Sequence, residues 1–240
     1  MSYISIAELS AGALELGIEL SEEQLGLFDR FAEFLVQTNM KFNLTRITDP
    51  GGIVASHFLD SLTCLRAVDF KNGDRVIDVG AGPGFPGLPM KIARPDLHVT
   101  LLDSTFKKVK FISDAAEMLE LEGIEAMQGR AEDVGRNKDF RERFDVACAR
   151  ALSELRVLAE LCLPLVRVGG YVIAQKSGEI DDELASARPV IGQLGGCVRD
   201  VVRMRIPGTE IDRQLVVISK TKPTPDTFPR PYSRIAKSKS

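Results

Sequence analysis

A short apolar run followed by four closely spaced glycines constrains the fold of this chain more than any other feature. Residues 75–87 read RVIDVGAGPGFPG, and helix-compatible sequence follows directly. Glycine is needed where φ is positive or where a ligand must lie against bare backbone, and a helix N-terminus offers free N–H groups to such a ligand. The segment therefore predicts a buried strand, a tight turn and a helix start that together cradle a cofactor, with glycines at Gly80, Gly82, Gly84 and Gly87.

The glycines alone leave the kind of cofactor open. The last three satisfy G-x-G-x-x-G, the dinucleotide fingerprint, but the glycine nearest the strand is Gly80, and the pattern read from there fails. The next apolar run, 98–102, closes on Asp103, where an acid can accept both hydroxyls of an adenosine ribose. Nicotinamide and S-adenosylmethionine enzymes both place an acid there. The S-adenosylmethionine interpretation also uses Asp78, close to where a cationic methionine group would lie. The alternative is a plain strand-to-helix turn with solvated acids.

Composition limits the class of protein. At 240 residues, with 44% hydrophobic and 27% charged residues, the chain fits one large α/β domain with an appendage. No apolar run approaches the roughly 20 residues of a membrane span, and no basic-then-apolar signal begins the chain. The four cysteines form no C-x-x-C pair and there are two histidines, so we expect no structural zinc and no disulfide scaffold. We expect a soluble, cytoplasmic protein that binds neither membrane nor metal.

Charge is distributed unevenly along the chain. The net charge is −3, but residues 220–240 carry six basic residues against one acid, which leaves the tail at +5 and the remainder at −8. Four prolines in this tail argue against a helix or a central strand. Such a tail is either a solvated end or an arm that contacts phosphates.

The first 70 residues predict helices, and the rest predict alternating strands and helices. Helical spacing covers 4–16, a helix opened by the capping box Ser21–Gln24, and 53–67. We predict strands at 75–79, 98–103, 124–127, 144–149 and 170–175, with helices near 86–94, 105–122, 131–140, 154–166 and 180–194. Two β-rich runs, 198–205 and 213–219, follow with only a short connection, so we expect them to be antiparallel.

This order of elements predicts an α/β fold. A parallel sheet that ends in an antiparallel hairpin is the layout of Rossmann-like class I methyltransferases, whereas nicotinamide domains usually continue with a sixth parallel strand. Alternating strands and helices imply parallel strands with right-handed crossovers. We expect a mostly parallel seven-stranded sheet with an antiparallel C-terminal strand. The predicted organisation is an N-terminal helical extension (1–70), a cofactor-binding domain (71–220) and a basic, proline-containing tail (221–240).

Further motifs accompany the glycine-rich loop. They are Asn43-Leu44-Thr45, His57-Phe58-Leu59-Asp60-Ser61, Leu102-Asp103-Ser104 with Lys107-Lys108, Arg130-Ala131-Glu132, Ala149-Arg150-Ala151, Lys176 and Phe228-Pro229-Arg230. Together they resemble one family, the bacterial small-subunit (16S) ribosomal RNA guanine-N7 methyltransferases, also called glucose-inhibited division protein B or methyltransferase G. The tail departs from the family's common form, which has Gly and Pro between its basic residues where this chain has Pro231-Tyr232-Ser233.

The resemblance implies that S-adenosylmethionine is the cofactor and locates its contacts. It implies contacts at Gly80 and Phe85 in the loop, at Ala131-Glu132 after the third strand and at Arg150 after the fourth. The predicted cofactor-binding set is completed by Asp78, Gly82, Asp103 and Ser104. Two members have structural alternatives: Phe85 as a core residue, and Glu132 as an acid that complements its helix N-terminus.

The resemblance also implies a reaction that needs no general base. Guanine N7 carries a free lone pair and no proton, so alignment of nucleophile, methyl group and sulfur supplies most of the catalysis. We expect no acid–base residue, and Arg150 and Lys176 as positioning candidates; the alternatives are an ion pair of Arg150 with a helix carboxylate, and a merely solvated Lys176. His57 and Asp60 are interpreted as helix-anchoring groups. The predicted RNA contacts are Arg130, Lys107, Lys108, Lys176, Arg230, Lys237 and Lys239.

Other functions remain possible at this point. One is a methyltransferase that acts on another RNA or on a small molecule, another a nicotinamide oxidoreductase, and a third an RNA-binding protein without activity. The favoured partner is small-subunit ribosomal RNA, as free RNA, an assembly precursor or the ribosomal subunit. Because no exposed apolar seam is evident in the sequence, we expect a monomer.

Overall fold

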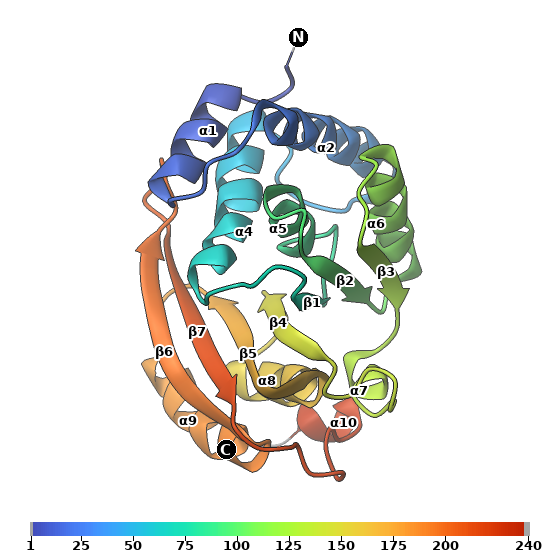
Figure 1. Cartoon of the computed structure of the whole chain (residues 1–240), viewed down its shortest axis with the longest axis vertical. Helices are drawn as coiled ribbons and strands as arrows, with labels where there is room; N and C mark the ends of the chain where they lie inside the picture. Colours follow the sequence, from blue (N-terminus) through green and yellow to red (C-terminus); the bar gives the residue numbers. More distant parts are fainter. Residues whose placement is uncertain (1, 238–240) are drawn as a thin grey trace.

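A single twisted sheet organises the chain (Figure 1), and the computed structural model describes residues 2–237. The strand order is β3-β2-β1-β4-β5-β7-β6. All neighbouring strands are parallel except the pairs made by β7, which runs antiparallel to both β5 and β6. The predicted mostly parallel sheet with an antiparallel end is confirmed. The strands are β1 (Arg75–Val79), β2 (His98–Asp103), β3 (Ile124–Gln128), β4 (Phe144–Arg150), β5 (Val166–Lys176), β6 (Gly196–Arg205) and β7 (Asp212–Lys220).

The register brings the carboxyl ends of β1, β2 and β4 to one edge. Val79 pairs with Leu102 on one side of β1, and Asp78 pairs with Cys148 on the other. In open parallel sheets ligands bind at this edge, where the strand order reverses. One strand differs from expectation: β5 begins at Val166 rather than near residue 170, because Val166 already pairs with Phe144 ahead of an irregularity in the β4–β5 register.

Alternate residues of β1 point into two different cores. Val76 belongs to the core that also holds Phe28, Phe31 and Phe58, so the N-terminal helices share one core with this face of the sheet. Ile77 belongs to the core on the other face. That second core is covered by α8 and α9 (Figure 1). Helices on both faces of the sheet are what parallel crossovers require. Their bounds are α5 (Gly87–Ala93), α6 (Phe106–Met118), α7 (Ala131–Val134), α8 (Leu155–Cys162), η3 (Leu163–Leu165) and α9 (Asp181–Gln193).

The N-terminal segment is helical, as predicted. Helix α1 spans Ile6–Glu15 and α2 spans Glu22–Phe42, where the capping box at Ser21 is confirmed: Ser21 N–H donates to Gln24 and Gln24 N–H donates to the Ser21 hydroxyl. The region predicted as one helix at 53–67 is helical throughout, but its hydrogen-bond pattern changes along the chain, so that it divides into a series of α-, π- and 3₁₀-helical turns that begins at Pro50. The series is α3 (Pro50–Gly52), the π-helix η1 (Ile53–Leu59), α4 (Asp60–Leu62) and the 3₁₀-helix η2 (Thr63–Arg66).

The tail contradicts one prediction. Despite its prolines it contains a short helix, α10 (Tyr232–Ile235), which begins directly after Pro231, where proline is compatible with a helix start. The segment before it is held against the domain by Arg141, whose guanidinium donates to the Phe228 and Thr224 carbonyls at 2.9 and 2.6 Å. The described part of the tail is therefore a packed element of the fold.

Helix α7 is also shorter than the predicted 131–140.

Candidate active site

The loop after β1 uses glycine where its backbone demands it. Gly80, Gly82 and Gly84 have φ of +76°, +59° and +93°, the left-handed region that side chains disfavour. A Cβ added at Gly80 would lie 2.6 Å from Leu152 Cδ1. The Gly80 and Ala81 N–H groups both donate to the Leu102 carbonyl, at 2.8 and 3.0 Å. The loop is thereby fixed across the end of β2.

Asp78 holds this loop from below and does not line the cavity. Its carboxylate is fully buried, and Oδ2 accepts a 2.8 Å hydrogen bond from Gly87 N–H at the start of α5. Burial raises the pKa of Asp78 to about 7, although the Gly87 hydrogen bond opposes the shift. The position of this carboxylate therefore does not support the expected contact with a methionine group. Gly87 is the first residue of α5, and because its N–H donates to Asp78, this N–H is not available to a ligand.

Asp103 does reach the cavity at the end of β2. Its Oδ1 accepts from Thr105 N–H at 2.8 Å, and its Oδ2 accepts from Gly82 N–H at 3.0 Å. Lys108 Nζ lies 3.4 Å from the same Oδ2. These contacts fix the orientation of the carboxylate, and a carboxylate has lone pairs for further donors.

A cavity of about 410 Å³ opens at this edge of the sheet, within the size range of small-molecule sites. It brings together seven predicted residues: Gly80, Asp103, Ser104, Lys108, Arg130, Ala131 and Glu132. The predicted residues Asp78, Gly82, Phe85, Lys107, Arg150 and Lys176 are not among its lining residues.

The floor of the cavity near α7 is charged. Glu132 is buried, and its Oε1 accepts a 2.9 Å hydrogen bond from Arg130 Nε. The Arg130 guanidinium also lies over the ring of Tyr232, 5.3 Å from its centroid. Glu132 therefore faces a cation as well as the start of its own helix, which favours the structural alternative for its side chain.

Phe85 is a core residue, which agrees with the alternative to a cofactor contact considered for it from the sequence. It is 2% exposed and stacks on the His57 imidazole, with ring centroids 4.3 Å apart. It also contacts Phe31, at 5.5 Å between centroids. His57 Nε2 and Thr45 Oγ1 lie 2.9 Å apart, and burial, together with nearby Arg150, lowers the pKa of His57 to about 4. His57 thus anchors the π-helix in its neutral form, in agreement with its interpretation as an anchoring group.

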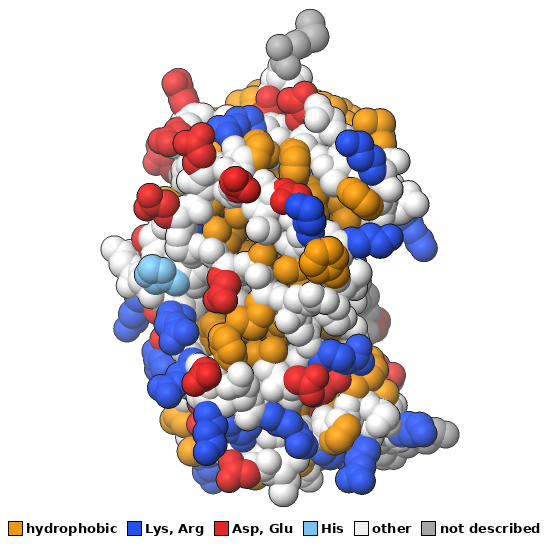
Figure 2. All heavy atoms as spheres, turned by 90° about the vertical axis from the view of Figure 1, so that its right-hand side faces the viewer, with side chains coloured by type: hydrophobic (Ala, Val, Ile, Leu, Met, Phe, Trp, Pro, Cys, Tyr) orange, Lys and Arg blue, Asp and Glu red, His pale blue; other side chains and the backbone are white. Residues whose placement is uncertain are grey.

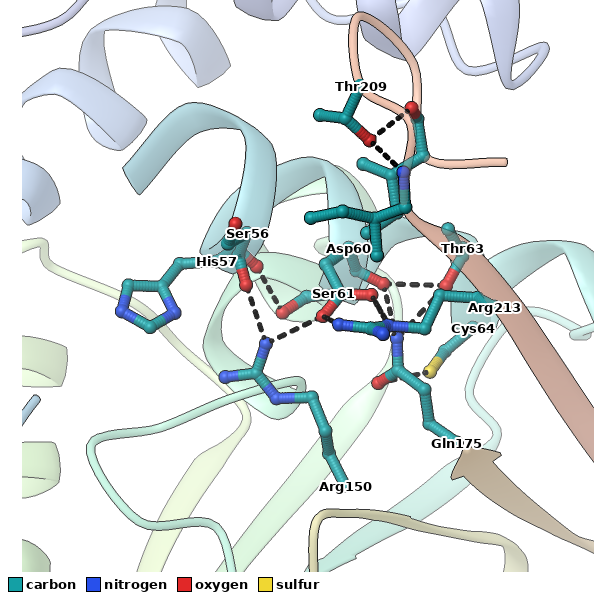
Figure 3. A network of polar contacts seen from close by, with 12 residues as sticks. Ser56, His57, Asp60, Ser61, Thr63, Cys64, Arg150, Gln175, Thr209 and Arg213 are labelled. Carbon is teal, nitrogen blue, oxygen red and sulfur yellow. Dashed lines mark hydrogen bonds and ion pairs between the residues drawn. The ribbon is translucent and has the colours of Figure 1, made fainter. Parts of the chain in front are cut away.

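Figure 3 shows that Arg150 points to Asp60, a buried carboxylate on α4. Arg150 Nη1 donates to the Ser56 carbonyl at 2.9 Å and to Asp60 Oδ2 at 3.1 Å. Arg213 of β7 pairs with the same carboxylate, and Gln175 Nε2 donates to Asp60 Oδ1 at 2.7 Å. The ion pair with a helix carboxylate is therefore the arrangement that Arg150 adopts.

Lys176 is also paired rather than solvated. Its Nζ donates to the Ser153 carbonyl at 2.8 Å and lies 2.5 Å from Glu183 Oε1 on α9. It stands at the end of β5, as predicted, but its charge is balanced within the domain.

Basic side chains border the hollow of this face. Figure 2 shows Lys and Arg side chains above and below a hollow at mid-height. Lys107 is exposed on α6, while Lys108 is half-buried beside Asp103. Arg230, expected to contact RNA, is instead bound to the buried Glu160 through Nη2 at 2.6 Å. Lys237 is exposed, and Lys239 lies outside the described residues.

Several residues of the site were not found from the sequence. Leu152, Leu161 and Tyr232 line the cavity, and Arg213 and Gln175 complete the Asp60 network. The sequence held one signal for these residues: at Tyr232 the tail departs from the common form of the family. Within residues 2–237, no helix is long and apolar enough to cross a membrane.

Known proteins resemble this chain along most of its length. The family model GidB, described as rRNA small subunit methyltransferase G, matches residues 24–215. Ribosomal RNA small subunit methyltransferase G of an Exiguobacterium species is 46% identical over 92% of this chain and 93% of its own, and that of Lachnoclostridium phytofermentans is 43% identical over 91% and 90%.

Solved structures share the fold. A SAM-dependent methyltransferase from Aquifex aeolicus aligns with a TM-score of 0.53 at 18% identity, covering 71% of this chain and 93% of that one. TrmN from Thermus thermophilus aligns with a TM-score of 0.53 at 22% identity, covering 67% and 48%. At these identities the likeness concerns the fold.

Proposed function

Since this chain belongs to the rRNA small subunit methyltransferase G family, we propose that it transfers a methyl group from S-adenosylmethionine to N7 of a guanine in small-subunit (16S) ribosomal RNA. The observation that carries the proposal is the cavity at the carboxyl edge of the sheet, where Gly80 and Asp103 meet. We propose that the protein acts in the cytoplasm and that it is a monomer. Sedimentation velocity would test the oligomeric state.

The chemistry of the cavity fits the adenosyl group of such a donor. Asp103 offers carboxylate oxygens for ribose hydroxyls, and the adjacent Ser104 offers a hydroxyl. Leu152 and Leu161 supply apolar walls. The bare backbone at Gly80 admits the methionine portion. The Ala131–Glu132 backbone is proposed to meet the adenine edge.

The residues present suit a reaction driven by alignment. S-adenosylmethionine supplies an electrophilic methyl group on a sulfonium. N7 of guanine needs no deprotonation, so the protein needs to orient its two substrates and exclude water. We propose that Arg150 is a positioning residue, because Asp60 fixes its direction through Nη1 and its guanidinium lies over the Phe85 ring, 5.1 Å from the centroid. Lys176, paired with Glu183, is a second candidate that would act from a fixed position.

We propose that the basic margin of the cavity receives the RNA. Lys107 is exposed on the first turns of α6, and Arg130 is exposed beside α7. Phosphate contacts of this kind position a nucleic acid without reading its sequence. Lys237 is a further candidate, whereas Arg230 is engaged by Glu160.

A test in cells separates this function from its rivals. Cells that lack the protein should lose one N7-methylguanine from small-subunit ribosomal RNA, detected as loss of chemical cleavage at that base. The wild-type gene should restore cleavage, and the Asp103→Asn variant should not. Unchanged cleavage in the deletion strain would refute the substrate, and would favour a methyltransferase that acts on another RNA or on a small molecule. Thermal stabilisation of the purified protein by NAD but not by S-adenosylhomocysteine would refute the cofactor.

A further inference from the structure

The last described helix closes one side of the cavity. Ile235 of α10 is 1% exposed and packs with Val157 and Leu161 of α8. Tyr232, one turn earlier, lines the cavity and is 39% exposed. One side of a single short helix is thus buried in the domain, while its aromatic ring remains open at the site.

An ion pair with a buried carboxylate fixes the position of this helix. Arg230 donates from its backbone N–H to Glu160 Oε1 at 2.8 Å and from its guanidinium to both carboxylate oxygens, while the Glu160 side chain is only 1% exposed. Arg136 Nε donates to the Pro229 carbonyl at 2.6 Å. Pro229 and Arg230, which precede α10, are therefore bound by charged groups of the domain. These contacts fix the position of Tyr232 at the start of the helix.

The surroundings of Tyr232 suit a flat aromatic ligand. The Arg130 guanidinium lies over its ring, and Arg130 is itself tied to Glu132 at the start of α7. Bases stack well on aromatic rings, and such stacking tolerates any base because it uses the π-face. Asp103 lines the same cavity as Ala131 of α7 and Tyr232 of α10, so a ligand whose ribose is held by Asp103 shares the cavity with this ring.

We propose that Tyr232 packs its ring against the adenine half of the methyl donor, so that the C-terminal tail is part of the cofactor site. The inference rests on the proposed cofactor and extends the proposed function to a residue of the tail. By thermodynamic linkage, cofactor binding and docking of the tail then stabilise each other.

Calorimetry with two ligands tests the contact. S-adenosylhomocysteine and 5′-methylthioadenosine share the adenosyl half, so Tyr232→Ala should weaken both by a similar factor, about tenfold. Tyr232→Phe keeps the ring and should bind both ligands as the wild type does. Tyr171→Ala is the matched control, because Tyr171 also lies under an arginine, with the Arg199 guanidinium 5.1 Å from its ring, but outside this cavity.

The outcomes separate this inference from the proposed function. A wild-type protein that binds neither ligand would overturn the proposed function and this inference with it. Wild-type binding that Tyr232→Ala leaves unchanged would overturn the inference alone.

Tyrosine fluorescence gives a second readout that does not depend on affinity. The chain has no tryptophan and three tyrosines, so a protein with Tyr3→Phe and Tyr171→Phe emits from Tyr232 alone. Saturation with S-adenosylhomocysteine should quench that emission, since a stacked adenine contacts the ring. Unchanged emission at saturation would overturn the proposal, even if Tyr232→Ala proved too unstable to study.

Discussion

Arg213 of β7 pairs with Asp60 of α4 through a 2.7 Å contact between Nε and Oδ1. Asp60 is 1% exposed and also receives Arg150. One buried carboxylate therefore joins the N-terminal helices to strands β4 and β7 (Figure 3). The helical extension is bound to the sheet by charge as well as by its shared core.

Asp60→Ala is expected to destabilise the whole protein. It would leave two guanidinium groups partly buried without their partner, at a cost of about 3–5 kcal/mol in the free energy of unfolding. Urea denaturation followed by circular dichroism would measure it. Asp114→Ala is the control, because its pair with Lys110 is solvent-exposed and should contribute little. A destabilisation no larger than that of the control would contradict the role assigned to Asp60.

Asp78 should make stability depend on pH in an unusual direction. Because burial raises the pKa of Asp78 to about 7, its contribution is complete below the unfolded pKa near 4 and declines as the pH rises through 7. Relative to Asp78→Asn, the wild type should therefore lose stability between about pH 4 and pH 7. Unfolding free energies of both proteins at a series of pH values test this. A difference that stays constant over the range would show that Asp78 titrates normally.

Asp103→Asn should weaken cofactor binding rather than folding. A carboxylate that accepts ribose hydroxyls contributes more than a neutral amide, because hydrogen bonds to charged groups are worth about 1.5–3 kcal/mol. We expect the dissociation constant of S-adenosylhomocysteine to rise at least tenfold in calorimetry. Asp96→Asn provides the comparison, since Asp96 precedes the opposite end of β2 and pairs with Arg94. Equal affinities for both variants would remove Asp103 from the site.

Arg230→Met separates a structural role from an RNA contact. The change removes the guanidinium from the buried Glu160 carboxylate, to which only the backbone N–H of residue 230 then still donates, and should lower the unfolding free energy by about 3 kcal/mol. The double variant Arg230→Met with Glu160→Met should recover part of this stability, because no buried charge is left unpaired. The salt dependence of RNA binding should stay as in the wild type. A smaller salt slope in Arg230→Met would instead assign Arg230 to a phosphate.

Lys107→Gln should weaken RNA binding uniformly across sequences. Removal of one lysine–phosphate interaction reduces the slope of log K against log salt by about 1. Filter binding to a small-subunit RNA fragment at several salt concentrations measures the slope. Lys71→Gln is the control, an exposed lysine just before β1, at the opposite edge of the sheet. Identical slopes for both variants and the wild type would place the RNA elsewhere.

The sequence predicted the fold, and it predicted that Gly80 and Asp103 lie together at the cavity, because those signals are local. The glycines after β1 and the acid at the end of β2 each follow directly from a strand, and their positions in the loop are set by a few neighbouring residues. The capping box at Ser21 is local in the same way.

The sequence could not show which charges the fold neutralises. Arg150, Lys176 and Arg230 were candidate ligand contacts, yet each pairs with a carboxylate from another part of the chain: Asp60, Glu183 and Glu160 respectively. Nothing in the local pattern of a lysine or arginine distinguishes a buried pair from an exposed one. The π-helical turn at 53–59 was hidden for a similar reason, since its apolar spacing resembles that of an ordinary helix.

The order of the strands has a consequence for synthesis of the chain. β1 pairs with β2 on one side and with β4 on the other, and β4 begins only at Phe144. A nascent chain can complete β1, β2 and β3 while the other edge of β1 is still unpaired. An open, apolar edge invites pairing with a second chain. Slow elongation before Phe144, or crowding of polysomes during overproduction, should therefore favour aggregation of nascent chains.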